Sequence, residues 1–322
     1  MNTRRRCLAA SAVWPALVWT GALHAQPNAP VVIGLLSAHE RQANVALVEA
    51  MAALGWKLGV HYRLEARYAE GVVDRLPALA QELAALKPAL VIAVPSSSAR
   101  AMAAAAPATP IVLAPGDPVA SGLVTNLARP GGMVTGLSSV SGELNVKLLE
   151  LVVEALPKIR RVGILADSTI RAHAAYMSNV RGAAERLGVA AHIAELAKPE
   201  DIEGAVARLA REKVQALVIA SNAWLWPHLP KIMALALAQR WPVVGTSPNV
   251  PKQGGLLSYG ASAGRAKRVA YYVDRILKGA KPGDLPIEQP TTFDMVLNLK
   301  TAKLLGITLP TSIRVRATEV IE

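Results

Sequence analysis

The feature that most constrains the fold is an internal repeat of three strand-like segments. These segments recur in the same order in the second half of the chain: Val32–Leu36 as Arg161–Ala166, Ala89–Ala93 as Ala216–Ala220, and Pro110–Val112 as Pro242–Val244. The middle pair has the identical sequence Ala-Leu-Val-Ile-Ala, and the aligned positions lie 131, 127 and 132 residues apart. A match that keeps both order and spacing predicts two copies of one lobe. The 322 residues suffice for two domains.

Each copy alternates short β-rich runs with helical patterns. In the first copy we expect strands at Val31–Ser37, Leu64–Tyr68, Ala89–Val94 and Ile111–Ala114, and helices at Gln42–Leu54, Asp74–Leu86 and Ser98–Ala105. Continuous apolar strands of this kind occur in parallel sheets whose two faces are both covered. The sequence therefore predicts an α/β fold with two doubly wound parallel-sheet lobes.

The C-terminal third holds more elements than a second copy needs. After Gly260 we expect a helix at Ala263–Lys278, an extended segment at Ile287–Leu299 and a short helix at Thr301–Leu305, which we interpret as return crossings between the lobes. Hinge strands then join lobe 1, residues 26–140 plus 262–292, to lobe 2, residues 141–261 plus 293–322. Two such lobes form a clamshell, and α/β ligands bind outside the carboxyl ends of the strands.

The first 25 residues have the pattern of an export signal. Arg4–Arg6 precede an apolar run, Leu8–Leu23, and Ala25 stands before Gln26, where we expect the mature chain to begin. The run is short for a membrane span and contains Pro15. We therefore expect a periplasmic protein that is exported by the general secretory or the twin-arginine route.

Charge and cysteine content exclude several classes of function. Removal of residues 1–25, which hold three Arg and no acidic residue, lowers the formal charge from +12 to +9. The basic residues are spread along the chain without a nucleic-acid motif, so we expect a solvated surface and no nucleic-acid partner. Cys7 is the only cysteine, so the mature chain has no disulfide, no Cys-ligated zinc and no cysteine nucleophile.

The usual signatures of catalysis are absent from the sequence. It contains no G-x-G-x-x-G after the first strand, no phosphate-binding P-loop and no G-x-S-x-G. The six histidines form no close ligand pair. We therefore expect no cofactor, no catalytic metal and no enzymatic activity.

Several sequence stretches together are specific to one family: Gly116–Val124, Arg129–Gly136, Tyr68–Gly71, Asp74–Pro77, Gly255–Gly260, Ile276–Gly279 with Pro282, and Phe293–Gly306. In these stretches the sequence resembles the ABC-transporter substrate-binding family that includes tryptophan- and tyrosine-binding proteins, and the resemblance covers nearly the whole mature chain. It implies a type I periplasmic-binding fold and, as partners, a small-molecule ligand and the permease and ATPase of an ABC importer. Met133 and Asp167-Ser168 stand where family members often have Asn and Asn-Pro, so the ligand does not carry over. An amino acid or an aromatic compound is one option.

Within that fold, ligand contacts should come from the loops that follow strands. The candidates are Ser37, His39, Ser96, Ser97, Ser98 and Asp117 in the first lobe, Asp167, Ser168, Asn222, Trp224 and Ser247 in the second, and Tyr259 beside a hinge strand. Several have a structural alternative. The three consecutive serines are equally suited to cap a helix, and Asp117 in Gly-Asp-Pro is suited to an Asx turn or to a ligand ammonium. Trp224 and Trp226 suit either stacking on a ligand or ordinary packing.

Three other functions share this architecture. An exported α/β enzyme would need a nucleophile or base with a partner, and none is visible. A ligand-sensing domain of a membrane receptor would use the same clamshell and stays open as an alternative. A sugar-responsive repressor would begin with a helix-turn-helix, where this chain has the export pattern. Because one chain supplies both lobes, we expect a monomer.

Overall fold

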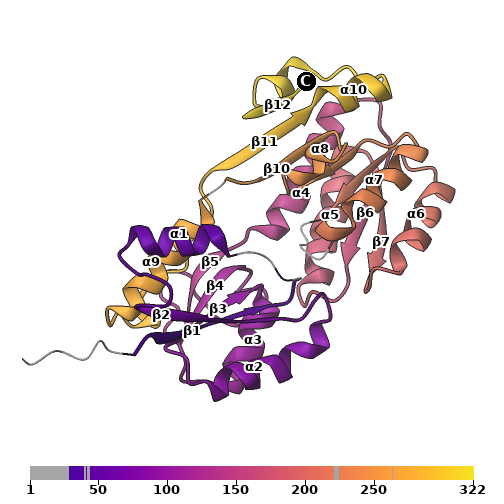
Figure 1. Cartoon of the computed structure of the whole chain (residues 1–322). Helices are drawn as coiled ribbons and strands as arrows, with labels where there is room; N and C mark the ends of the chain where they lie inside the picture. Colours follow the sequence, from indigo (N-terminus) through magenta and orange to yellow (C-terminus); the bar gives the residue numbers. More distant parts are fainter. Residues whose placement is uncertain (1–28, 40, 42–43, 221–224, 263) are drawn as a thin grey trace, which may run out of the picture.

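The computed structural model describes residues 29–39, 41, 44–220, 225–262 and 264–322. It contains two sheets, each with helices on both faces (Figure 1). The sheet of lobe 1 has five parallel strands in the order β2-β1-β3-β4-β5. These strands are β1 (Val31–Ser37), β2 (Tyr62–Tyr68), β3 (Leu90–Val94), β4 (Ile111–Gly116) and β5 (Val134–Ser138).

Both faces of the lobe 1 sheet are buried under helices. One face packs on α2 (Leu76–Ala85) and α3 (Ser96–Ala105), and the other on α1 (Val45–Ala53) and α9 (Arg265–Leu277). Consecutive residues of β3 illustrate this, because Val91 belongs to the first core and Ile92 to the second. Alternate residues of a strand point to opposite faces, which explains why the strands read as continuous apolar runs.

The sheet of lobe 2 has seven strands in the order β12-β11-β10-β9-β8-β6-β7. They are β6 (Arg161–Asp167), β7 (Ala190–Leu196), β8 (Ala216–Ile219), β9 (Val243–Gly245), β10 (Leu257–Ala261), β11 (Phe293–Asn298) and β12 (Glu319–Ile321). On one face lie α4 (Ser141–Ala155), α5 (His173–Leu187), α10 (Leu299–Leu305) and α11 (Thr311–Arg314). On the other lie α6 (Asp201–Arg211), α7 (Leu229–Ala238) and α8 (Asn249–Lys252). Two doubly wound lobes confirm the predicted fold class.

One strand of lobe 2 departs from the parallel pattern. β11 pairs antiparallel with β10, whereas its neighbour β12 is parallel to it. The reason lies in the path of the chain: β10 leaves lobe 2 at its carboxyl end, and β11 re-enters from the same end (Figure 1). A return crossing therefore has to run against the strand beside it.

The described residues cross between the lobes at three places. The chain passes from β5 to α4, from β10 to α9, and from the segment around Glu288 to β11. Glu288 still belongs to lobe 1, since its amide donates to the Gly136 carbonyl at 2.9 Å and it forms a bridge with Leu137. Pro290 has no N–H to continue that pairing, so the expected extended segment Ile287–Leu299 enters the second sheet only at Phe293. We propose lobe boundaries within these three crossings.

A glycine precedes two of the crossings at corresponding places in the two lobes. Gly136 in β5 has a φ of +119°, and a Cβ there would stand 2.4 Å from the Leu113 carbonyl oxygen. Gly260 in β10 leaves space for the Thr246 carbonyl oxygen, which would lie 2.0 Å from an added Cβ. Only a residue without a side chain fits such close backbone contacts.

A search for membrane-spanning helices among the described residues finds none of sufficient length and hydrophobicity. The apolar run at Leu8–Leu23 and the expected cleavage before Gln26 lie outside the described residues.

Candidate functional site

His39 and Asp167 lie at the carboxyl ends of β1 and β6, the corresponding strands of the two lobes. Burial lowers the pKa of His39 below its usual value of 6.5, and the negative charge of Asp167 acts in the opposite direction. His39 Nδ1 is buried and has no hydrogen-bond partner among the described residues. The His39 amide donates to Ser37 Oγ at 3.1 Å, which fixes the backbone of the loop. A buried ring nitrogen without a partner is available for a ligand.

The corresponding side chains of lobe 2 are bonded within their own lobe. Asp167 Oδ1 accepts from the Thr169 amide at 2.8 Å and from its hydroxyl at 2.6 Å. The Ser168 hydroxyl donates to the Leu196 carbonyl at 3.1 Å. Farther along the edge, Ser247 Oγ accepts from the Asn249 amide at 3.2 Å. These contacts hold the loops in place, and the Asp167 side chain is buried, with 6% of its surface exposed.

The three serines at the start of α3 have different environments. Ser98 is 0% exposed and its hydroxyl donates to the Val94 carbonyl at 2.7 Å, so it has no surface to offer a ligand and the expectation for it is corrected. No serine side chain caps α3. Ser96 Oγ is buried without a partner among the described residues and lies close to Gly116. Ser97 is half-buried.

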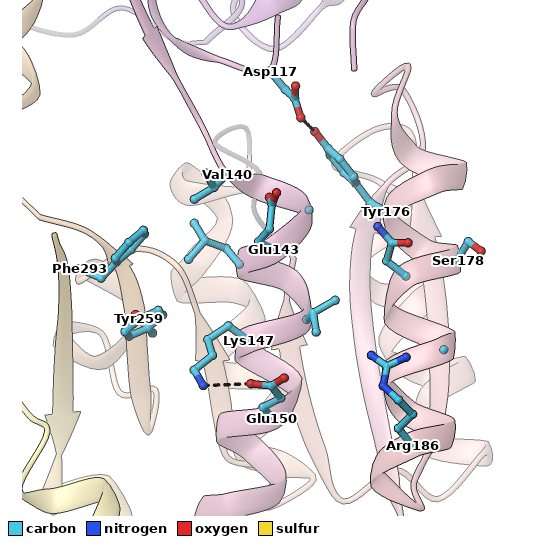
Figure 2. A pocket seen from close by; sticks show the side chains of 15 residues that line it. Asp117, Val140, Glu143, Lys147, Glu150, Tyr176, Ser178, Arg186, Tyr259 and Phe293 are labelled. Carbon is cyan, nitrogen blue, oxygen red and sulfur yellow. Dashed lines mark hydrogen bonds and ion pairs between the residues drawn. The ribbon is translucent and has the colours of Figure 1, made fainter. Parts of the chain in front are cut away.

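Asp117 forms the turn that its Gly-Asp-Pro setting suggests and also makes a second contact. Its Oδ1 accepts from the Ala120 amide at 3.0 Å, which is an Asx-type turn. Its Oδ2 accepts a hydrogen bond from the hydroxyl of Tyr176, a residue of α5 in lobe 2 (Figure 2). Burial, this bond and the charge of Asp117 raise the pKa of Tyr176.

Asp117 and Tyr259, both predicted site residues, line one cavity of about 670 Å3, which we call the hinge-side cavity. Figure 2 shows α4 crossing this cavity, with α5 on one side and Tyr259 and Phe293 on the other. The cavity is lined by Asp117, Val140, Gly142, Glu143, Leu144, Val146, Lys147, Glu150, Tyr176, Ser178, Asn179, Gly182, Arg186, Tyr259 and Phe293. The rings of Tyr259 and Phe293 are stacked, with centroids 5.4 Å apart and an interplanar angle of 15°.

Sequence reasoning missed Tyr176 and Phe293. Tyr176 lies inside a helix rather than after a strand, so the rule that selects post-strand loops passes over it. Phe293 lies opposite Ala261 and near Tyr259 because β11 runs antiparallel to β10, an arrangement that the sequence alone does not predict. Asn222 and Trp224 lie outside the described residues. Trp226 packs against the lobe 2 core, as its packing alternative stated. Among the described residues no cluster of His, Cys, Asp or Glu could hold a metal ion.

Comparison with known proteins yields a family and several relatives. The family profile described as ABC transporter substrate binding protein matches residues 32–321. A tyrosine-binding protein of Clostridioides difficile is 22% identical over 269 residues, which are 83% of this chain and 77% of the relative.

Solved structures of similar fold include proteins from three bacteria. A conserved domain protein from Vibrio cholerae superimposes with a TM-score of 0.84 at 25% identity and covers 90% of this chain and 99% of its own. A domain from Streptococcus pneumonia in complex with L-Trp has a TM-score of 0.79 at 24% identity, over 90% of this chain and all of its own (100%). A ligand-free, open substrate-binding protein from Clostridium difficile has a TM-score of 0.64 at 23% identity, over 90% and 99%.

Proposed function

This chain belongs to the ABC transporter substrate-binding protein family, and we propose that it is the periplasmic solute-binding component of an ABC importer. Its partners are then a small organic ligand and the permease and ATPase of that importer. The family assignment rests on a match that spans residues 32–321. The two-lobed fold supports it, because a ligand that contacts both lobes favours their closed arrangement.

The observation that carries the proposal is the position of His39 and Asp167 at the carboxyl ends of β1 and β6, the corresponding strands of the two lobes. The charge of Asp167 in lobe 2 acts on the pKa of His39 in lobe 1, which supports the proposal that the two side chains face one site. The partnerless Nδ1 of His39 and Oγ of Ser96 add two polar atoms that a bound molecule would satisfy. We propose that the ligand lies at this edge, with Ser37, Ser97, Ser168 and Ser247 around it.

An amino acid is the ligand class that we favour. Relatives are named as binding tyrosine or are solved with L-Trp, and an amino acid needs a site with both a carboxylate and hydrogen-bond donors. Asp167 offers the carboxylate, and the amides at the start of α3 point toward the same edge, where a helix N-terminus favours a ligand carboxylate.

The same proposal includes export, a monomeric state and the absence of catalysis. One chain supplies both lobes, so no second copy is needed to complete the site. The basic, apolar pattern of residues 1–25 supports export by the secretory or twin-arginine route. Finding the full-length chain in the cytoplasm would contradict the export claim.

Native mass spectrometry of protein purified gently from the periplasm tests the function. We expect one chain mass carrying one small molecule, which is identified after release with methanol. L-Tyr and L-Trp are then titrated by calorimetry beside the released compound. Protein that carries no small molecule and binds neither amino acid nor any released compound would refute the proposal.

A further inference from the structure

The hydrogen bond between Tyr176 and Asp117 joins the two lobes. Asp117 follows β4 in lobe 1, whereas Tyr176 lies in α5 and belongs to the core of lobe 2. In Figure 2 the Tyr176 side chain points from α5 toward the Asp117 carboxylate, and the bond is drawn between them. Separation of the lobes would move α5 away from the loop after β4, so this bond opposes opening.

The packing of lobe 2 fixes the position of the Tyr176 hydroxyl. Tyr176 is only 8% exposed and lies in the core that α4 and α5 share. A Cβ added to Gly142 in α4 would stand 3.2 Å from two carbon atoms of the Tyr176 ring, so the helix backbone lies directly against the ring. A side chain held in this way loses little further freedom when its hydroxyl bonds.

The turn after β4 fixes the position of the Asp117 carboxylate in the same manner. Oδ1 accepts from the Ala120 amide at 3.0 Å, and the Asp117 main-chain carbonyl accepts from the Ser121 amide, also at 3.0 Å. Oδ2 is then directed to Tyr176. A hydrogen bond to an ionised acceptor is roughly twice as strong as one between neutral groups.

We propose that Tyr176 and Asp117 form an interlobe strut that limits how far the lobes open. Tyr176 acts as a positioning residue, which holds the Asp117 carboxylate at the hinge-side cavity. The strut deepens the proposed function and rests on it for the opening motion that it limits. Its effect is measured on the ligand-free protein, so the test does not depend on the identity of the ligand.

Distance measurement between two spin labels tests the strut. Cys7 is the only cysteine and precedes Gln26, so Val72→Cys and Lys198→Cys introduce the only thiols of the mature chain. Val72 follows β2 and Lys198 follows β7, the edge strands farthest from the crossings, and both residues are exposed. In the ligand-free protein we expect Tyr176→Phe to give a longer and broader distance distribution than the wild-type background. An unchanged or shorter distribution overturns the proposal.

Tyr272→Phe is the matched control. Tyr272 is also buried, and its hydroxyl donates to the Pro286 carbonyl at 2.5 Å, but both residues belong to lobe 1. Both variants should lower the melting temperature by a similar amount, roughly 2–4 °C, and only Tyr176→Phe should change the distance. Equal widening by the control would overturn the strut. If Tyr176→Phe fails to fold, Asp117→Asn provides the same test, because it removes the charge on the acceptor.

Discussion

The two lobes share a backbone plan but differ in what their polar atoms do. In lobe 1, the edge that faces the other lobe carries buried polar atoms without partners among the described residues, His39 Nδ1 and Ser96 Oγ. In lobe 2, Asp167, Ser168 and Ser247 all make hydrogen bonds within their own lobe. A buried polar atom without a partner costs free energy. We propose from this difference that the partnerless atoms of lobe 1 bind the ligand and that lobe 2 closes over it.

The largest effect is expected at the glycines that precede a crossing in each lobe, and it concerns the stability of the fold. Gly136→Ala and Gly260→Ala should each destabilise the protein by about 3 kcal/mol or more, because the new Cβ meets a backbone oxygen in both lobes. Gly132→Ala, where nothing lies within 4 Å of the added Cβ, is the control and should change little. Chemical denaturation monitored by circular dichroism gives these values. Tolerance of alanine at one position only would show that the two crossings are not equivalent.

Substitution of His39 in lobe 1 and of Asp167 in lobe 2 tests how the two lobes differ in their contribution to binding and to stability. His39→Ala should weaken binding of the released ligand by about 1.5–3 kcal/mol, as expected for a lost hydrogen bond to a charged group, with little loss of stability. Asp167→Ala should weaken binding as well, because it removes the carboxylate proposed to meet the ligand, and should in addition destabilise the fold by about 1 kcal/mol or more, because it removes the acceptor of two local hydrogen bonds. Calorimetry measures the loss of binding and thermal denaturation the loss of stability. Unchanged affinity of His39→Ala for the ligand would contradict the proposed contact.

The pH dependence of stability gives the smallest effect. Burial lowers the folded-state pKa of His39 below 6.5, so the unfolded chain binds this proton first as the pH falls. The contribution of neutral His39 is therefore fully present above pH 6.5 and is lost as the pH drops through the lower folded pKa. Between about pH 8 and pH 5, the melting temperature of the ligand-free wild type should decrease more steeply with falling pH than that of His39→Asn. An equal decrease for both proteins would mean that the His39 ring is not buried in its neutral form.

The fold class could be predicted from the sequence because apolar runs mark the strands and their repetition marks the two lobes. Ala89–Ala93 and Ala216–Ala220 correspond to β3 and β8, and the expected strand Val31–Ser37 is β1 without change. The antiparallel direction of β11 did not follow, because it depends on the end of the sheet from which the chain returns.

The candidate site was only partly accessible to the same reasoning. His39 and Asp167 could be proposed from the sequence because loops after parallel strands meet at one edge. The contact between Tyr176 and Asp117 could not be predicted, because it depends on how the two lobes are oriented across the three crossings. Ser98 was wrongly included because a run of serines does not reveal which hydroxyl turns inward.

The most direct test of a ligand-driven clamshell is the Val72→Cys, Lys198→Cys distance measured with and without the released ligand. These labels report the width of the mouth, because β2 and β7 are edge strands remote from the crossings. A ligand that contacts both lobes must shift the population toward the closed form. The account predicts that one equivalent of ligand shortens and narrows the distance distribution. A distribution that stays the same at saturation, with binding confirmed by calorimetry in the same sample, would contradict it.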